Sequence, residues 1–535
     1  MLKYIKRISV ECAYRLRLKT GGEKRKMKLN YKRTILVGFA FFLISAFWQA
    51  YDAIVPLILT NHFGLDQLLS GIVMSIDNVL AVFMLPIFGA LSDKVMTKMG
   101  RRTPFILVGT VAAVLAFISL TFIDAYQLSS VLEAGIAEKY EVAANLLKEA
   151  NVALKEAGKA GDVAAISAAK ESIDYINKVV IAGIREETLQ ITLGNLMPII
   201  GFIGVLLLTL ISMATFRSPA VALMPDVTVK PLRSKGNAII NLMGTAGGII
   251  VLVLGMVFKT SGNKYMQYTA YVIAVCAIMV TGLIVFLATV REKKWADEME
   301  EQTIALGLEE NPVITNEAKR SLSKAEMKSL LLILASVALW YVGYNSITSK
   351  YSVYATNILF FDFNFTLIIA QAAAVISYIP VGIIASKIGR RKTILAGITM
   401  LATAFFIGNF ITFSTPELAM YPVFILAGIG WATINVNSFP MVVELAKGGE
   451  VGKYTGYYYT ASMAAQIVAP ILSGAIYKLV GHMVGGDDIE GMRYVFFAFG
   501  TLFVALSFVT MFFVKHGDAK AEKQDALEAL GGADD

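Results

Sequence analysis

One short pattern occurs twice in this chain, once in each half. An apolar stretch ends in a glycine-containing turn, a Gly-Arg-Arg triplet follows, and a second apolar stretch begins. The two copies span residues 89–102 and 382–391. Repetition at corresponding places predicts two related halves, each with its arginine turn after its second membrane helix. The pattern therefore constrains both the architecture and the orientation of the chain.

The hydropathy of the chain supports a membrane bundle. Hydrophobic residues make up 56% of the sequence and charged residues only 16%, and the mean hydropathy is +0.64. A helix that crosses a bilayer needs about 20 mostly apolar residues, and these stretches lack the alternating polarity of membrane strands. We therefore predict an all-α integral membrane protein with twelve transmembrane helices, near 34–60, 67–92, 104–124, 190–224, 237–258, 266–290, 329–357, 365–387, 393–413, 418–445, 454–479 and 493–514.

Lysine and arginine predict the orientation of these helices. The segment before residue 34 holds twelve of them, and the connections after helices 2, 6 and 8 hold four, seven and three. On the opposite face, the connections after helices 1, 7 and 9 hold no lysine or arginine, and the connection after helix 5 holds Lys259 and Lys264. The positive-inside rule places both termini in the cytoplasm of a multi-pass protein of the plasma membrane.

Several classes of function are disfavoured. Cys12 and Cys276 form no metal-binding spacing, so no metal site and no cofactor are expected. The three histidines are isolated in sequence, and His62 is interpreted as a loop residue. The chain lacks a phosphate-binding loop motif. We expect no enzyme activity, no nucleic-acid partner and no obligatory protein partner.

The domain organisation follows from the helix predictions. Its parts are a basic cytoplasmic segment (1–33), an N-terminal six-helix bundle (34–290), a cytoplasmic central loop (291–328), a C-terminal six-helix bundle (329–514) and a cytoplasmic tail (515–535).

An extracellular insertion, residues 125–189, separates helices 3 and 4 of the first bundle. Apolar residues recur at helical spacing from Ile136 to Leu154 and again from Ile166 to Val180, which predicts two helices packed as an antiparallel hairpin. Asp162 is the expected N-cap of the second helix. Two roles remain open for the hairpin: a solvated decoration without a role in function, or a lid or partner-binding element.

Ionisable side chains within the apolar stretches are the strongest functional signal, because a charge at the bilayer centre costs about 3 kcal/mol. Asp77 is the first candidate for proton or cation coupling, since no basic residue lies in its own helix. Asp52 is the alternative, paired across the bundle with Lys350 or Arg217.

Amides and aromatic rings in the same stretches form a candidate ligand site. Their alternative role is ordinary packing and helix–helix hydrogen bonding, worth about 0.6 kcal/mol per bond. The candidate substrate-binding residues are Trp48, Gln49, Asn78, Trp340, Tyr344, Asn345, Gln371, Trp431, Asn435 and Asn437.

Charged residues near the turns form a candidate gate. Asp226 and Glu444 are each followed nine residues later by a lysine, which suggests matching acid–base pairs in the two halves. Asp93 is expected to accept hydrogen bonds from the N-terminus of the eleventh helix. Solvation or structural ion pairing is the alternative for all of them. The full set is Asp93, Arg101, Arg102, Asp226, Lys235, Arg390, Arg391, Glu444 and Lys453.

These motifs carry a family resemblance. The segment 89–106 resembles the loop 2–3 signature of the major facilitator superfamily, and segments 217–226 and 428–444 resemble its sucrose-transporter-like branch, near the glycoside–pentoside–hexuronide cation symporters. The resemblance implies a proton-coupled symporter of α-glucosides such as sucrose or maltose that works by alternating access. Sucrose carriers of plants place an acidic residue in the middle of helix 4, whereas residues 199–211 contain none.

Sugar chemistry agrees with the candidate site, because amides bind hydroxyls and aromatic faces cover the apolar faces of a sugar ring. Three alternatives stay open: a sodium-coupled sugar symporter, an exporter of the same fold and a non-transporting sugar sensor.

Overall fold

The computed structural model describes residues 29–229, 232–305, 322–443, 445 and 451–516. Within these residues the chain is helical throughout, and eleven helices are long and apolar enough to cross a membrane. A shorter apolar segment, Phe363–Tyr378, lies in the helix at the place of the predicted eighth span. The all-α membrane fold is thus confirmed, while the count of twelve spans stays a prediction.

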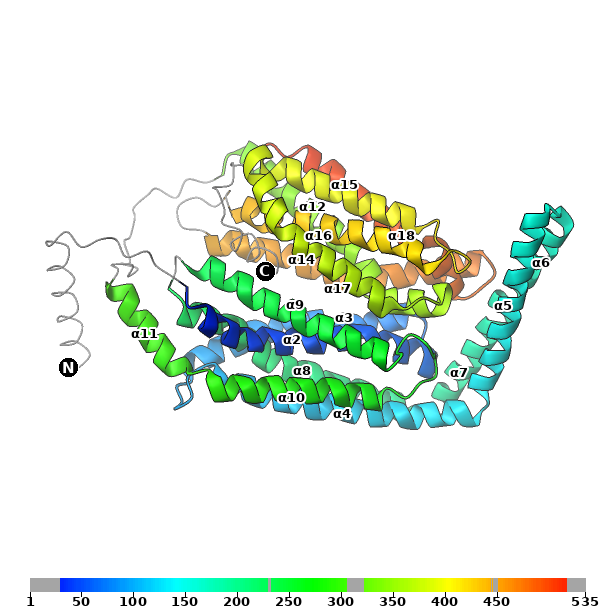
Figure 1. The fold of residues 1–535 in the computed structure, drawn as a ribbon, viewed down its shortest axis with the longest axis horizontal. Coiled ribbons are helices and arrows are strands. Elements are labelled where there is room, and N and C mark those ends of the chain that lie inside the picture. The colour runs from blue at the N-terminus through cyan, green and yellow to red at the C-terminus, as the bar shows by residue number, and fades with distance from the viewer. Residues whose placement is uncertain (1–28, 230–231, 306–321, 444, 446–450, 517–535) are drawn as a thin grey trace.

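The first half of the chain forms one bundle (Figure 1). Within it α2 packs along α9, and α4 packs along α8. Prolines start two of these helices, where a missing backbone N–H leaves no bond unmade. The bundle consists of α2 (Tyr31–Leu57) with its π-helical extension η1 (Ile58–His62), α3 (Gln67–Lys94), α4 (Thr103–Glu133), α8 (Met197–Val227), α9 (Arg233–Val257) and α10 (Thr269–Thr289).

The second half forms a bundle beside the first, and α11 (Glu292–Ala305) precedes it. Ser323 and Glu326 close a reciprocal capping box at the start of its first helix. The bundle consists of α12 (Lys324–Thr348), α13 (Tyr351–Tyr354) with η4 (Ala355–Leu359), α14 (Phe363–Ile388), α15 (Arg390–Gly408), η5 (Glu417–Ala419), α16 (Met420–Val443), α17 (Val451–Met483) and α18 (Asp488–Phe512).

The insertion projects from one end of the molecule, which we call the hairpin end (Figure 1). It contains α5 (Ile136–Ala160), α6 (Val163–Tyr175), the π-helical η2 (Ile176–Ile181) and α7 (Ala182–Gly194). The N-cap prediction for Asp162 is confirmed, since its side chain accepts from two backbone N–H groups at 3.0 Å.

The helices on either side of the insertion end and begin later in the chain than expected. Apolar residues carry α4 on to Glu133, and the predicted start of the fourth span at residue 190 falls inside α7. Most of the predicted seam residues gather in one apolar cluster, but that cluster also includes Leu128, Val131 and Tyr265 from the first bundle. The hairpin therefore packs on the body of the protein as well as on itself.

The two bundles meet closely at the hairpin end. An added Cβ on Gly474 of α17 would lie 2.2 Å from the backbone oxygen of Gln67 at the start of α3, and one on Gly71 would lie 2.2 Å from that of Pro470. Glycine at these positions lets two backbones touch without intervening side chains. A hydrogen bond between the π-helical segments of the two halves, from Asn357 of η4 to Asn61 of η1 at 3.1 Å, lies at the same end.

Candidate functional site

The bundles are bridged near mid-height by a pair of glutamines. The Gln371 side-chain amide on α14 donates to Gln49 Oε1 on α2 at 2.7 Å. Gly248 of α9 faces this pair, and a Cβ there would contact both amides at 3.4–3.5 Å. Both glutamines belong to the predicted substrate-binding set, and the fold joins them from opposite halves.

Two carboxylates of the first bundle interact with each other, Asp52 on the same helix as Gln49 and Asp77 on α3. Asp52 stays accessible to solvent although its neighbours Tyr51 and Ala53 are buried and protein surrounds it. It lies close enough to Asp77 for their charges to repel each other. Asn78 donates to Asp77 Oδ1 at 2.8 Å. The two predicted coupling acids therefore belong to one cluster of interacting charges.

Arg217 is the positive member of this cluster. It extends from α8 and attracts the charge of Asp77, and its guanidinium carbon lies 5.5 Å from the ring centre of Trp48. Trp48 Nε1 and the Tyr51 hydroxyl are buried without a hydrogen-bond partner among the described residues. A buried donor without a partner is uncommon, and a ligand is one way to satisfy it.

An aromatic stack belongs to the second bundle. The ring of Tyr344 lies parallel to that of Trp431, with 3.8 Å between their centres and 9° between their planes. Tyr341 meets Trp431 edge-on at 5.5 Å. Gly428 lets α16 approach α14 at Ala370, beside the bridging glutamine, since a Cβ there would lie 2.2 Å from the Ala370 oxygen.

Other members of the predicted substrate-binding set are held within their own bundle. Trp340 is fully buried. Asn345 donates to the Tyr341 backbone oxygen at 2.8 Å, and Asn437 donates to that of Thr433 at 2.9 Å. Asn435 is buried as well. In this conformation the amides of Asn345 and Asn437 are bonded within their own helices, and the role of these four residues in binding stays a prediction.

Lys350 lies elsewhere. Its ammonium donates to the backbone oxygen of Gln67 at 2.6 Å and to its side-chain oxygen at 3.0 Å. The expected pairing of Asp52 with Lys350 is thus not formed in this conformation, because Lys350 is held at the hairpin end. Gln67 was not among the predicted residues, and nothing in its polar sequence neighbourhood distinguishes it.

The first arginine turn forms a network within its own bundle. Arg101 binds both oxygens of Asp226, at 2.6 and 3.1 Å, and Arg102 binds Asp226 at 2.8 Å. Arg102 also pairs with Asp93, whose side chain is 57% exposed. The expected contact of Asp93 with the eleventh helix is replaced here by this pair.

Sequence analysis missed the centre of that network. Glu292, almost fully buried at the start of α11, accepts from the backbone N–H groups of Arg101, Arg102 and Thr103 at 2.7–2.9 Å and from the Thr103 hydroxyl at 2.7 Å. It therefore neutralises the positive end of α4. Its place in a charged linker concealed this role.

In the second arginine turn, Arg391 donates to the backbone oxygen of Phe512 and lies over its ring at 5.8 Å, while Arg390 begins α15. The side chains of Lys235 and Lys453 and the whole of Glu444 lie outside the described residues.

The interpretation of His62 as a loop residue was wrong. It lies fully buried in η1, where Nδ1 is 2.6 Å from Asp124 of α4 and Nε2 is 3.1 Å from the backbone oxygen of Lys264. An acid inside the third apolar stretch was the available signal for such a partner.

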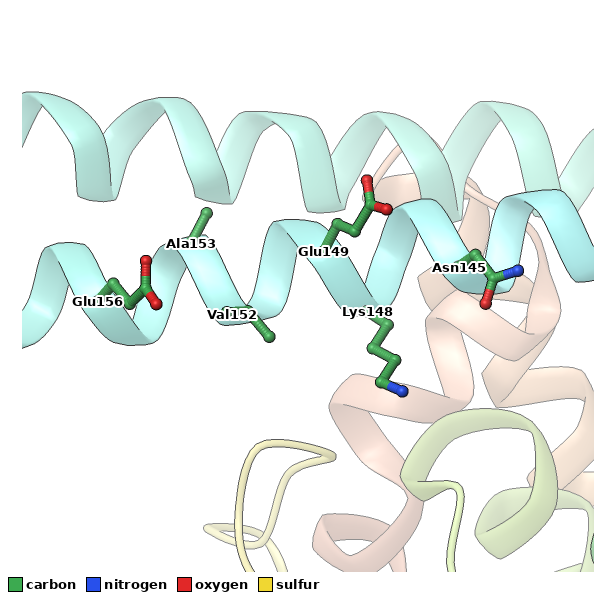
Figure 2. Close-up of a pocket in the computed structure, with 6 residues that line it drawn as sticks. All are labelled: Asn145, Lys148, Glu149, Val152, Ala153 and Glu156. Atoms are coloured by element: carbon green, nitrogen blue, oxygen red, sulfur yellow. The ribbon is translucent and has the colours of Figure 1, made fainter.

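A shallow hollow lies away from this site, on one face of α5. In Figure 2, Val152 and Lys148 point away from the neighbouring helix of the hairpin. The hollow is lined by Asn145, Lys148, Glu149, Val152, Ala153 and Glu156. It contains neither an aromatic ring nor any of the predicted site residues.

Two long apolar helical bundles joined by a polar bridge, with charged and aromatic side chains inside them, are typical of a polytopic membrane transport protein. The sequence pattern of the Major Facilitator Superfamily matches residues 18–137 and 360–531, and the chain belongs to this family. The predicted superfamily membership is thus confirmed.

Known proteins give further similarities. A stretch of 111 residues is 30% identical to the MFS-type transporter ppzB of Metarhizium rileyi (strain RCEF 4871), covering 20% of this chain and 22% of that protein. The chain thus matches about a fifth of that relative's length.

Solved transporters share the fold. The inward open form of the xylose transporter XylE from E. coli is 14% identical with a TM-score of 0.51, covering 93% of this chain and 98% of that one. A D-xylose-proton symporter is 12% identical with a TM-score of 0.54, at 90% and 98% coverage. A bacterial homologue of the human drug peptide transporters PepT1 and PepT2 is 11% identical with a TM-score of 0.55, at 90% and 97% coverage. At these identities the similarity establishes the fold alone.

Proposed function

We propose that this transporter is a proton-coupled sugar symporter of the plasma membrane, with substrates of the sucrose or maltose type. The observation that carries the proposal is the mixed site between the bundles. Asp77, Arg217 and the Trp48 ring lie on the first bundle, Tyr344 and Trp431 lie on the second, and the glutamine pair joins them. A sugar presents hydroxyls to such amides and charges, and its apolar faces to such rings.

Trp48 Nε1 supports a hydroxyl-bearing ligand. It is a buried donor without a partner among the described residues, and a sugar hydroxyl or ring oxygen is a suitable acceptor. The glutamine bridge offers further donors and acceptors once a ligand separates the two amides. When the sugar binds, the hydrogen bond between the two glutamines would be replaced by hydrogen bonds to the sugar, and no polar group would be left unpaired.

Asp77 supports coupling to protons. Its carboxylate has Arg217 as a counter-charge and Asn78 as a hydrogen-bond donor, with a second carboxylate, Asp52, nearby. A proton on Asp77 would release Arg217 and thereby alter the site that binds the sugar. The absence of an acid from residues 199–211 makes Asp77 the preferred proton carrier.

The conformation fits one state of an alternating-access cycle. The positive-inside rule places the hairpin end outside the cell and both termini in the cytoplasm. Because the halves are packed together at the hairpin end, we assign this structure to an inward-facing state. The solvent-accessible Asp52 is consistent with a substrate path from the cytoplasmic side.

Counterflow in proteoliposomes tests the proposal. The purified protein is reconstituted with an unlabelled internal sugar, and entry of labelled sucrose, maltose and xylose is followed with and without pH and sodium gradients. Transient accumulation that a pH gradient enhances supports the proposal. Sodium dependence would move the coupling to the sodium ion, and sugar binding without counterflow would indicate a sensor. Absence of both binding and counterflow across the sugar panel would overturn the sugar assignment.

We expect Trp431→Ala to raise the KM for sugar by about 5- to 30-fold while lowering the maximal rate less, since it removes one aromatic face and unstacks Tyr344. Trp431→Phe keeps a ring and is expected to recover most of the loss. Concentration dependence of initial uptake measures both. An unchanged KM in Trp431→Ala would remove the ring stack from the substrate site.

We expect Asp93→Asn to leave sugar affinity intact but to change the ratio of inward- to outward-facing molecules by about two- to fivefold, the size of a charge effect at a helix terminus. In this conformation Asp93 pairs with Arg102, and its proposed partner in the other state is the N-terminus of α17. Spin-label distances between the cytoplasmic ends of the two bundles report the ratio. Identical distributions in variant and wild type would argue against a gating role.

A further inference from the structure

The hairpin is inserted in the first bundle but contacts the second. In Figure 1 it rises from the end of α4 and stands beside the end of the second bundle. Its second helix approaches the turn between α17 and α18, where a Cβ on Gly486 would lie 3.4 Å from the side chain of Lys178. A solvated decoration would not need to cross the junction between the two bundles.

An ion pair fixes this crossing. Arg185 of α7 pairs with Asp487, and its Nη1 lies 3.8 Å from Asp488; the three side chains are only 15%, 21% and 10% exposed. Asp488 also accepts from the backbone N–H of Gln67 at the start of α3, and Gln67 in turn holds the Lys350 ammonium. The hairpin is therefore joined to the same cluster that closes the two bundles at this end.

A second contact crosses the junction independently. The ammonium of Lys264, in the loop between α9 and α10, lies 4.1 Å from the ring centre of Tyr140 on the hairpin and 5.9 Å from that of Phe360 on the second bundle. Lys264 is buried, and burial, with repulsion from Arg185 as a smaller cause, lowers its pKa well below the ordinary value. Aromatic faces on both sides offset part of the cost of holding this group.

The backbone around this contact is held in place. His62 bonds the backbone oxygen of Lys264, and Tyr265 stacks on the His62 ring and meets Tyr140 edge-on at 5.8 Å. Phe360 has a φ of 59°, which a residue with a side chain adopts only when its surroundings impose it. The contact is thus a defined arrangement rather than a chance approach of surface groups.

We propose that the hairpin is a strap that fastens the first bundle to the second at the hairpin end, and that this end opens only when the strap detaches from the second bundle. The proposal rests on the alternating-access transport argued above, because a strap matters only if the two bundles separate. It makes Arg185 a positioning residue for the conformational equilibrium, with no contact to substrate.

Spin-label distances test the strap directly. Labels at Gln267 and Leu418, exposed on opposite bundles at the hairpin end, are placed in a Cys12→Ser, Cys276→Ala background and measured in nanodiscs. We expect Arg185→Gln to raise the ratio of open to closed molecules at this end by about tenfold or more, as for loss of one member of a largely buried ion pair.

The matched control is Lys139→Gln, which removes an ion pair with Glu187 that lies wholly within the hairpin; the open-to-closed ratio should not change. Asp487→Asn keeps the N-cap of α18, whose acceptor bonds Glu490 N at 2.9 Å, so the pair can be tested without unwinding the helix. In the Asp487→Asn background, Arg185→Gln should raise the open-to-closed ratio much less than it does in the wild type.

Two results would overturn the strap: an unchanged distance distribution in Arg185→Gln, or equal shifts in Arg185→Gln and Lys139→Gln. Either leaves the proposed sugar transport standing, because wild-type counterflow is measured separately. Conversely, a wild-type protein without sugar counterflow that still shows the shift would remove the sugar assignment and keep the strap.

Discussion

Asp77→Asn is expected to abolish accumulation of sugar against its gradient while exchange of internal for external sugar continues. Accumulation needs a group that binds a proton on one side and releases it on the other, and asparagine cannot do so. Exchange needs only the loaded carrier to change its conformation. Uptake driven by a pH gradient and counterflow without one, measured on the same proteoliposomes, separate the two processes.

The neighbouring carboxylate supplies the comparison. Asp52→Asn should weaken coupling less, because Arg217 attracts the charge of Asp77, whereas the charge that acts on Asp52 is the repulsive one of Asp77. Asp162→Asn, which retains the N-cap of α6, controls for loss of a charge far from the site. If Asp77→Asn still concentrates sugar and Asp52→Asn does not, the proton carrier lies on α2 instead.

Glu292→Ala should destabilise the first bundle by roughly 3 kcal/mol, since three backbone N–H groups and one hydroxyl lose their charged acceptor in a buried place. We expect a melting temperature in detergent several degrees below that of the wild type. Glu292→Gln keeps one acceptor oxygen, so its melting temperature should lie between those of the wild type and Glu292→Ala.

Glu298→Ala is the control for this change. Glu298 lies one turn and a half further along α11, is about a third exposed, and pairs with Arg33 at 2.6 Å; exposed pairs of this kind contribute about 1 kcal/mol or less. Equal melting temperatures for Glu292→Ala and Glu298→Ala would contradict the anchoring role assigned to Glu292.

The parts of the structure that follow from local pattern were predictable from sequence. Long apolar stretches predicted the membrane helices, and residue types at helix starts predicted caps such as Asp162, because both depend on neighbours within a few residues. The repeated arginine turn indicated the superfamily for the same reason. Gln49 and Gln371 were each predicted as substrate-binding residues, but local pattern could not predict the hydrogen bond between them.

The rest depends on contacts between distant segments. Gln67, Glu292, His62 and Arg185 are ordinary polar residues in the sequence, and only the packing of the bundles gives each its partner. The same limit explains the Lys350 prediction. Because Lys350 lies near the end of a helix, its ammonium could pair with Asp52 or with groups at the hairpin end. Which partner it takes depends on how the two halves pack against each other.

The direct backbone contact of α3 with α17 has a mechanical consequence. At Gly71 and Gly474 the backbones of the two halves touch with no side chain between them, so separation at these two points requires no side chains to disengage. Ion pairs resist the parting of the two halves here, among them Lys478 of α17 with Asp66, the N-cap of α3, at 2.6 Å, and the pair that holds the hairpin. A single methyl group on either glycine would hold the two halves apart at the hairpin end. Gly71→Ala or Gly474→Ala is therefore expected to fix this transporter in its outward-facing form without changing a substrate contact or a charge.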